Sequence, residues 1–255
     1  MKKGMAAVVA VTALLVPGIA GALAPNSVLP VYDVAVDCQR LLPTRETVDH
    51  VIPKAGSRIP LEVLVVVDRR DVTKAEASFK LASKSFERVG IDLNWRVRRK
   101  SIPNLGFETG PYLKWLKKGT GGMRPRGFDV VYLATSHRLY SNGQADCIGG
   151  IAYAQHAFAV GALEWYGVVG VRVDGFTEDL PQGPPLPDGG AKLVVHEIGH
   201  LLGGHHHFGS CGTPPEADDP SHPCDVMNPA LVQQIGLHYG PVNAAIVRQH
   251  AQKYL

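Results

Sequence analysis

The pattern of hydrophobic and polar positions predicts a sheet built from several short strands. The runs LEVLVVVD (61–68) and FDVVYLAT (128–135) are apolar and contain β-branched residues, as in strands that are buried on both faces. IDLNWRVRR (91–99) alternates like a strand with one exposed face. KAEASFKLASKSFERVG (74–90) and GPYLKWLKKG (110–119) carry apolar residues at helical spacing. This order of strands and helices predicts a right-handed, largely parallel α/β unit.

Further strands and two more helices are predicted after that unit. GGIAYAQ (149–155) and YGVVGVRVDG (166–175) predict two short strands. AKLVVHEIGHLLGG (191–204) has helical spacing and ends at two glycines, and PVNAAIVRQHAQKYL (241–255) predicts a final helix with Pro241 in its first turn. We therefore expect a mixed α/β (α+β) fold. It has an N-terminal twisted, mostly parallel sheet with helices, followed by a smaller, loop-rich C-terminal part with a final helix.

The first 59 residues have a different character. MKKG followed by an apolar run that ends in small residues is the layout of a secretory signal peptide, which we place at 1–22. An uncleaved membrane anchor is the alternative, because the run is nearly long enough to span a bilayer. Residues 23–59 are Pro-rich and predict an N-terminal extension or short pro-segment. The expected location is therefore outside the cell, with one large domain at 60–255.

Composition and charge narrow the expected partners. The chain has 255 residues, of which 45% are hydrophobic and 19% charged, as in ordinary globular proteins. Removing the leader leaves 24 basic and 23 acidic side chains. This balance predicts no nucleic-acid surface and no membrane binding after cleavage. We expect a monomer.

The stretch HEIGHLLGGHHH (196–207) carries the candidate chemistry. At about 100° per residue, His196 and His200 project about 40° apart on one face of a helix, so both imidazoles can reach one tetrahedral zinc ion. Glu197 projects beside that face, where it can contact a metal-activated water. Gly203 permits the positive φ that ends the helix, so that His206 can return as a third ligand. Three protein ligands leave one position open, as in a catalytic zinc site.

Other histidines and acids offer alternatives. His205 and His207 flank His206 and are alternative third ligands, although the spacing from Gly203 favours His206. A downstream glutamate ligand is disfavoured, because Glu216 lies in a predicted loop. The remaining histidines are expected to be ordinary surface or partly buried residues; they are His137, His156, His222 and His238.

With the pattern H-E-x-x-H-x-x-G-x-x-H at 196–206, the sequence resembles the metzincin metallopeptidases. Met227, in CDVMNPA, matches their methionine-containing turn. GGIAY, the cysteine before the methionine and MNP itself look most like the reprolysin branch, in a bacterial secreted form. Two positions depart from related patterns: His207 stands where reprolysins usually carry Asp, and Pro229 where astacins and serralysins carry Tyr.

The resemblance implies a secreted zinc endopeptidase that hydrolyses peptide bonds with a metal-activated water and Glu197 as general base. It divides the domain into an upper part (60–203) and a lower part (204–255). It also implies that an extended substrate lies beside an edge strand, for which GGIAYAQ is the candidate, and that residues 229–240 form the wall of the pocket for the residue after the cut. A non-catalytic zinc-binding or scavenging protein is the alternative function, and a degenerate protease-like binding module is a third.

Four cysteines in the exported part predict two disulfides. In several metzincin families a pro-segment group, sometimes a cysteine, occupies the open zinc position, and Cys38 is such a candidate. Parity favours a different arrangement, because a free Cys38 would leave Cys147 unpaired if Cys211 pairs with Cys224. We therefore predict Cys38–Cys147 and Cys211–Cys224, although spacing alone does not determine connectivity.

Overall fold

The computed structural model describes residues 58–137, 139, 150–153, 157–164, 188–206, 224–228 and 236–255. The five strands are β1 (Ile59–Val67), β2 (Ile91–Arg99), β3 (Val130–Thr135), β4 (Gly150–Tyr153) and β5 (Phe158–Ala162). The helices are the 3-10 turn η1 (Arg69–Asp71), α3 (Val72–Arg88), α4 (Thr109–Gly119), α5 (Gly189–Leu201) and α6 (Pro241–Tyr254). None of the helices described is long and apolar enough to cross a membrane. The predicted leader and N-terminal extension lie outside the described residues.

The strands form one sheet in the order β2-β1-β3-β5-β4. β1 pairs in parallel with both β2 and β3, and β3 pairs in parallel with β5. β4 runs antiparallel to β5 and forms one edge of the sheet. The predicted mixed α/β fold with a mostly parallel sheet is therefore confirmed, and the strand predicted at 149–155 lies at one end of the sheet that the described residues form.

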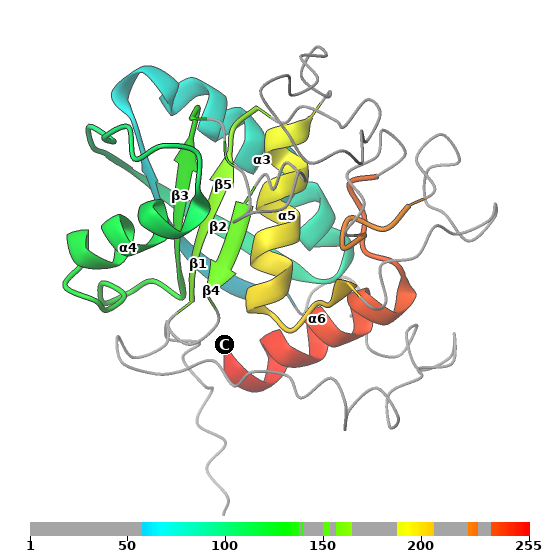
Figure 1. Cartoon of the computed structure of the whole chain (residues 1–255). Coiled ribbons are helices and arrows are strands. Elements are labelled where there is room, and N and C mark those ends of the chain that lie inside the picture. The colour runs from blue at the N-terminus through cyan, green and yellow to red at the C-terminus, as the bar shows by residue number, and fades with distance from the viewer. Residues whose placement is uncertain are drawn as a thin grey trace, which may run out of the picture.

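Helices cover both faces of the sheet. Figure 1 shows α5 and α3 together on one side and α4 on the other. α3 is amphipathic, and Phe79 lies on its buried face. The Phe79 ring packs edge-to-face against Tyr132 of β3, with 5.3 Å between the ring centroids, and its centroid lies 5.9 Å from that of Trp95 of β2. This burial of aromatic surface fixes α3 across the strands that form the centre of the core.

The predicted element bounds agree with the structure where the periodicity is clear. β2 has the predicted bounds 91–99, and the exposed Arg96 and Arg98 alternate with more buried neighbours. α3 begins directly after η1, and its N-cap residue, Asp71, makes no side-chain bond to the helix. Its carboxylate instead accepts a hydrogen bond from the Ser136 hydroxyl at 2.7 Å. The strand predicted at 166–175 lies outside the described residues.

One strand was not predicted from the sequence. β5 reads FAVGA, and all five of its residues are buried. A strand buried on both faces shows no alternation, and this one contains small residues with little strand preference. Its position between β3 and β4 follows from the packing of the sheet rather than from its own residues.

α5 and α6 frame the histidine-rich segment. α5 is apolar on nearly all sides because it packs against β4, β5 and α3. α6 begins at Pro241, as predicted, and lies beneath the end of α5 (Figure 1). α6 therefore lies beside the segment that follows α5, where the His205 N–H donates to the Asn243 side chain of α6.

Candidate metal centre

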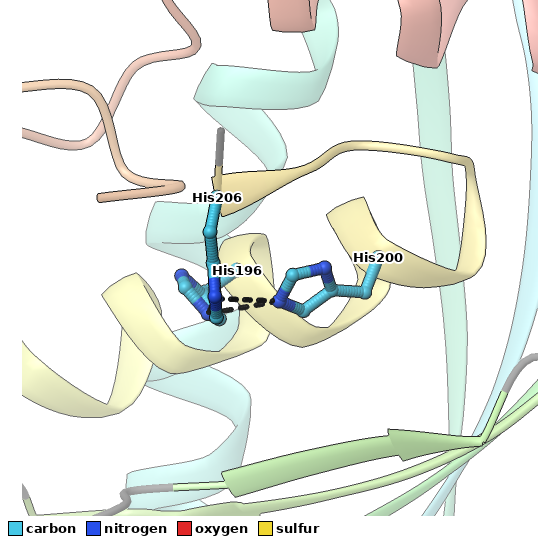
Figure 2. A group of neighbouring side chains, drawn as sticks. All are labelled: His196, His200 and His206. Carbon is cyan, nitrogen blue, oxygen red and sulfur yellow. Dashed lines mark hydrogen bonds between the residues drawn. The ribbon is translucent and has the colours of Figure 1, made fainter. Parts of the chain in front are cut away.

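α5 carries two of the three candidate ligands, and the third follows the end of that helix. His196 and His200 lie one turn apart on α5, and both are partly buried. Gly203 has a φ of 83°, a conformation that residues with a Cβ rarely adopt. The chain reverses after α5 and brings His206 back toward the helix (Figure 2).

Two backbone hydrogen bonds close the end of α5. The Gly203 N–H donates to the His200 carbonyl at 3.1 Å, and the Gly204 N–H donates to the Gly199 carbonyl at 2.8 Å. This is the bonding pattern of a Schellman cap, which needs a left-handed residue at the position of Gly203. The predicted role of Gly203 in ending the helix is therefore confirmed.

The three imidazoles point their Nε2 atoms at one another (Figure 2). The Nε2 of His196 lies 3.1 Å from that of His200 and 3.0 Å from that of His206, and the last two lie 3.0 Å apart. Within the described residues, these three form a group that could hold a metal ion.

The opposite ring nitrogens determine the tautomers of the two helical ligands. The Nδ1 of His196 donates to the Val226 carbonyl at 2.7 Å, and the Nδ1 of His200 donates to the Gly204 carbonyl at 2.9 Å. A carbonyl only accepts, so both protons lie on Nδ1 and each neutral ring presents a lone pair at Nε2. Lone pairs facing one another at 3 Å repel unless a cation lies between them, which is the arrangement that a metal site requires.

Desolvation favours the neutral form of these rings, although His206 is the most exposed of the three. Desolvation lowers the pKa of His196 to about 4. Desolvation, followed by the neighbouring histidines, lowers the pKa of His200 well below its ordinary range, and desolvation also lowers the pKa of His206. Neutral imidazoles are the form that binds metal, so the three residues are ready to act as ligands at neutral pH.

The spacing of the nitrogens fits zinc. Three imidazole nitrogens at about 2.0–2.1 Å from a tetrahedral zinc ion lie about 3.3–3.4 Å apart. The observed separations of 3.0–3.1 Å differ from this by only a few tenths of an ångström. Three histidine nitrogens are also the protein ligand set of some catalytic zinc sites.

Met227 lies in the core directly behind the ligands. Its side chain is fully buried, and a Cβ placed on Gly199 would lie only 2.8 Å from the Met227 sulfur and 3.0 Å from the Tyr239 ring. The Tyr239 hydroxyl donates to the carbonyl of Val195 at 2.7 Å. The absence of a side chain at Gly199 thus allows the segment around Met227 to support the ligand-bearing helix.

Glu197 lies on α5 beside the ligands but outside their group. Its side chain is 4% exposed, and desolvation raises its pKa to about 8. Burial raises the pKa of the Tyr132 phenol on β3, and the nearby charge of Glu197 raises it further. A buried carboxylate next to a cation site is suited to exchanging protons with a water or substrate there.

The raised pKa of Glu197 predicts how pH affects the zinc-free protein. Its carboxyl holds a proton in the folded state up to about pH 8, whereas the ordinary value is 4.5. The contribution of this carboxyl group to the free energy of unfolding therefore falls by at most about 5 kcal/mol as the pH rises from 4.5 to about 8. Glu197→Gln removes this loss, so we expect the variant to melt above wild type by a margin that grows with pH.

Thermal melts of both chelator-treated proteins from about pH 5 to about pH 9 measure that margin. His196 has the opposite effect: because its pKa is lowered from the ordinary value of 6.5, its contribution makes the protein more stable as the pH rises toward 6.5. This contribution is the same in wild type and variant, so it cancels when the two melting temperatures are subtracted. Melting temperatures that run parallel across the range would contradict the pKa of Glu197.

The structure also contains supporting residues that the sequence did not reveal. Asp225 and Asn243 are buried and hydrogen-bonded to each other next to the ligands. The only sequence signal was the acidic residue two positions before Met227, and nothing marked Asn243 within its helix. His238, expected to be an ordinary histidine, is buried. The alternatives His207 and Glu216 lie outside the described residues.

The similarities to known proteins lie among solved structures. The chain matches no protein-family profile and no curated protein. Archaemetzincin from Methanopyrus kandleri is similar over 78% of this chain and 98% of its own, at 15% identity and a TM-score of 0.45. A chain of a chaperone–substrate complex is similar over 78% of this chain, at 13% identity and a TM-score of 0.45, and this chain spans 38% of it. At these values neither similarity assigns an activity, so we base the function on the three histidines and their surroundings.

Proposed function

We propose that this protein is a zinc-dependent endopeptidase. The observation that carries the proposal is the convergence of three neutral imidazole Nε2 atoms within 3.1 Å, with the buried Glu197 beside them. The ligands are His196, His200 and His206. A zinc-storage protein needs neither an open coordination position nor a glutamate at this place.

The chemistry combines a metal with a carboxylate. His196, His200 and His206 would hold a zinc ion through their Nε2 atoms, and the ion would supply a Lewis acid that polarises the peptide carbonyl and favours ionisation of water. The Glu197 carboxylate accepts the proton of the attacking water and delivers it to the leaving nitrogen, so that the peptide bond is replaced by an acid and an amine. With a cation held beside it, the Glu197 carboxyl would have a pKa below its value in the zinc-free protein, so it would be ionised and could act as a base at neutral pH.

The sheet offers a place for an extended substrate. β4 is an edge strand of the described sheet, and α5 packs against it. An edge strand presents unpaired backbone groups, to which a peptide can add as a further strand. A peptide bound along β4 would lie next to the ligand-bearing helix.

A peptide-library digest with the purified protein tests this function. We expect cleavage within peptides, loss of cleavage after chelation, and recovery when zinc is restored. Absence of cleavage in a protein that retains zinc would favour the non-catalytic zinc-binding alternative instead.

The cellular context is also proposed. We propose that residues 1–22 are removed as a signal peptide and that the mature protein is a secreted, monomeric member of the reprolysin-like metzincins. The supporting features are the apolar leader and the motifs around Met227. The disulfides Cys38–Cys147 and Cys211–Cys224 stay predictions, because only Cys224 lies within the described residues.

A further inference from the structure

A chain of buried hydrogen bonds connects α6 to the metal centre. The Asp225 carboxylate accepts from the Met227 N–H at 2.7 Å and from the Asn243 side-chain amide at 2.9 Å, and it also accepts from the Gly240 N–H. The Asn243 carbonyl oxygen accepts from the His205 N–H at 2.9 Å. Asp225 and Asn243 are 1% and 0% exposed, so these bonds are shielded from water.

The network reaches two ligands that come from different segments. His205 directly precedes His206, so the bond from Asn243 holds the backbone of the third ligand. Val226 stands between Asp225 and Met227, and its carbonyl accepts the Nδ1 proton of His196 at 2.7 Å. The side chains of Asp225 and Asn243 thus hold two segments in place: the one behind His196 and the one that carries His206.

His200 has a different support. Its Nδ1 donates to the Gly204 carbonyl, which belongs to the cap of α5 itself. His196 and His206 therefore depend on the side chains of Asp225 and Asn243, whereas His200 is oriented within its own helix and cap.

Only an amide suits the position of Asn243. It must present an acceptor to the His205 N–H and a donor to the Asp225 carboxylate at the same time, and asparagine has both on one short side chain. Aspartate has the same size but no donor and would place a second carboxylate against Asp225. Leucine has a similar size but would leave the His205 N–H and one carboxylate oxygen without this partner.

We propose that Asn243, held by Asp225, is the positioning residue for the third zinc ligand, so that α6 sets the metal affinity of the site. Without this bond the backbone of His205, which directly precedes His206, loses its hydrogen bond to α6. The inference rests on the metal-binding part of the proposed function and not on peptide cleavage.

Zinc affinity tests this role directly, by competition between zinc-free protein and a fluorescent chelator. We expect Asn243→Leu and Asn243→Asp to bind zinc about 10- to 100-fold more weakly than wild type, the usual effect of losing a group behind a ligand. The cobalt-substituted variants should also show a weaker tetrahedral absorption band, a signature that lower stability alone does not change.

Arg248→Met is the matched control. Arg248 lies on the same helix, is 2% exposed, and donates to the Gly90 carbonyl at 2.6 Å, on the side facing α3 and β2. This variant should melt at a lower temperature and yet bind zinc as wild type does. Equal zinc affinity for both Asn243 variants and wild type would overturn the positioning role alone, whereas a wild type that binds no zinc would overturn the proposed function as well.

A measurement without substitutions covers the case in which the Asn243 variants do not fold. Amide hydrogen exchange in zinc-free wild type should show a His205 N–H that is protected, because it is bonded to the buried side chain of Asn243. Rapid exchange at His205 would show that the bond does not persist without metal and would overturn the proposal.

Discussion

Glu197→Gln is expected to reduce peptide cleavage by about 100- to 10,000-fold while the zinc content stays at about one ion per chain. Glutamine has nearly the same size but cannot accept the proton of the attacking water. Because the Glu197 carboxylate lies outside the group of three Nε2 atoms, the ligands keep their positions. Cleavage rates with an internally quenched peptide, and zinc content by elemental analysis, measure the two effects separately.

The matched control for this substitution is Glu87→Gln. Glu87 lies on α3 with its side chain 47% exposed, near Arg58 at the surface. Removing this charge should leave both cleavage and zinc content unchanged. If Glu197→Gln retained cleavage, general-base catalysis by Glu197 would be wrong; if it lost zinc, Glu197 would have to be counted among the ligands.

His206→Ala is expected to weaken zinc binding by more than about 100-fold, since even groups behind a ligand contribute 10- to 100-fold. Two imidazoles on one helix remain, and water must fill the other positions. Titration of zinc-free protein in competition with a chelator of known affinity measures the loss.

The neighbouring histidines provide the controls. The ring of His205 lies 6.5 Å from that of His206 and takes no part in the group of Nε2 atoms. His205→Ala and His207→Ala should therefore bind zinc within a few-fold of wild type. A greater loss in either of these than in His206→Ala would show that the third ligand had been assigned in the wrong register.

Much of the fold was predictable because its signals are local. β2 alternates, α3 and α4 have an apolar stripe, and Pro241 marks the start of α6, so each shows its type within a few residues. β5 was missed because it is buried on both faces, which removes the alternation. The position of β1 between β2 and β3 was not predicted, because the right-handed crossover rule gives a strand order only once the face of the sheet that each helix covers is known.

The candidate ligands were also predictable, and for the same reason. His196 and His200 are four residues apart on one helix, so their directions follow from helix geometry alone. Gly203 permits the left-handed turn that returns His206, and its φ of 83° agrees with that role.

The groups that orient those ligands depended on tertiary structure. The partner of His196 is the carbonyl of Val226, and the partner of the His205 N–H is Asn243, 38 residues away. Every residue has a backbone carbonyl, and many helices contain an asparagine, so neither carries a sequence signal. Their roles exist only because α6 and the segment at 224–228 pack against the end of α5. Local spacing thus decides which side chains can bind a metal, whereas long-range packing decides which atoms hold them in place, because those contacts join segments that share no periodicity.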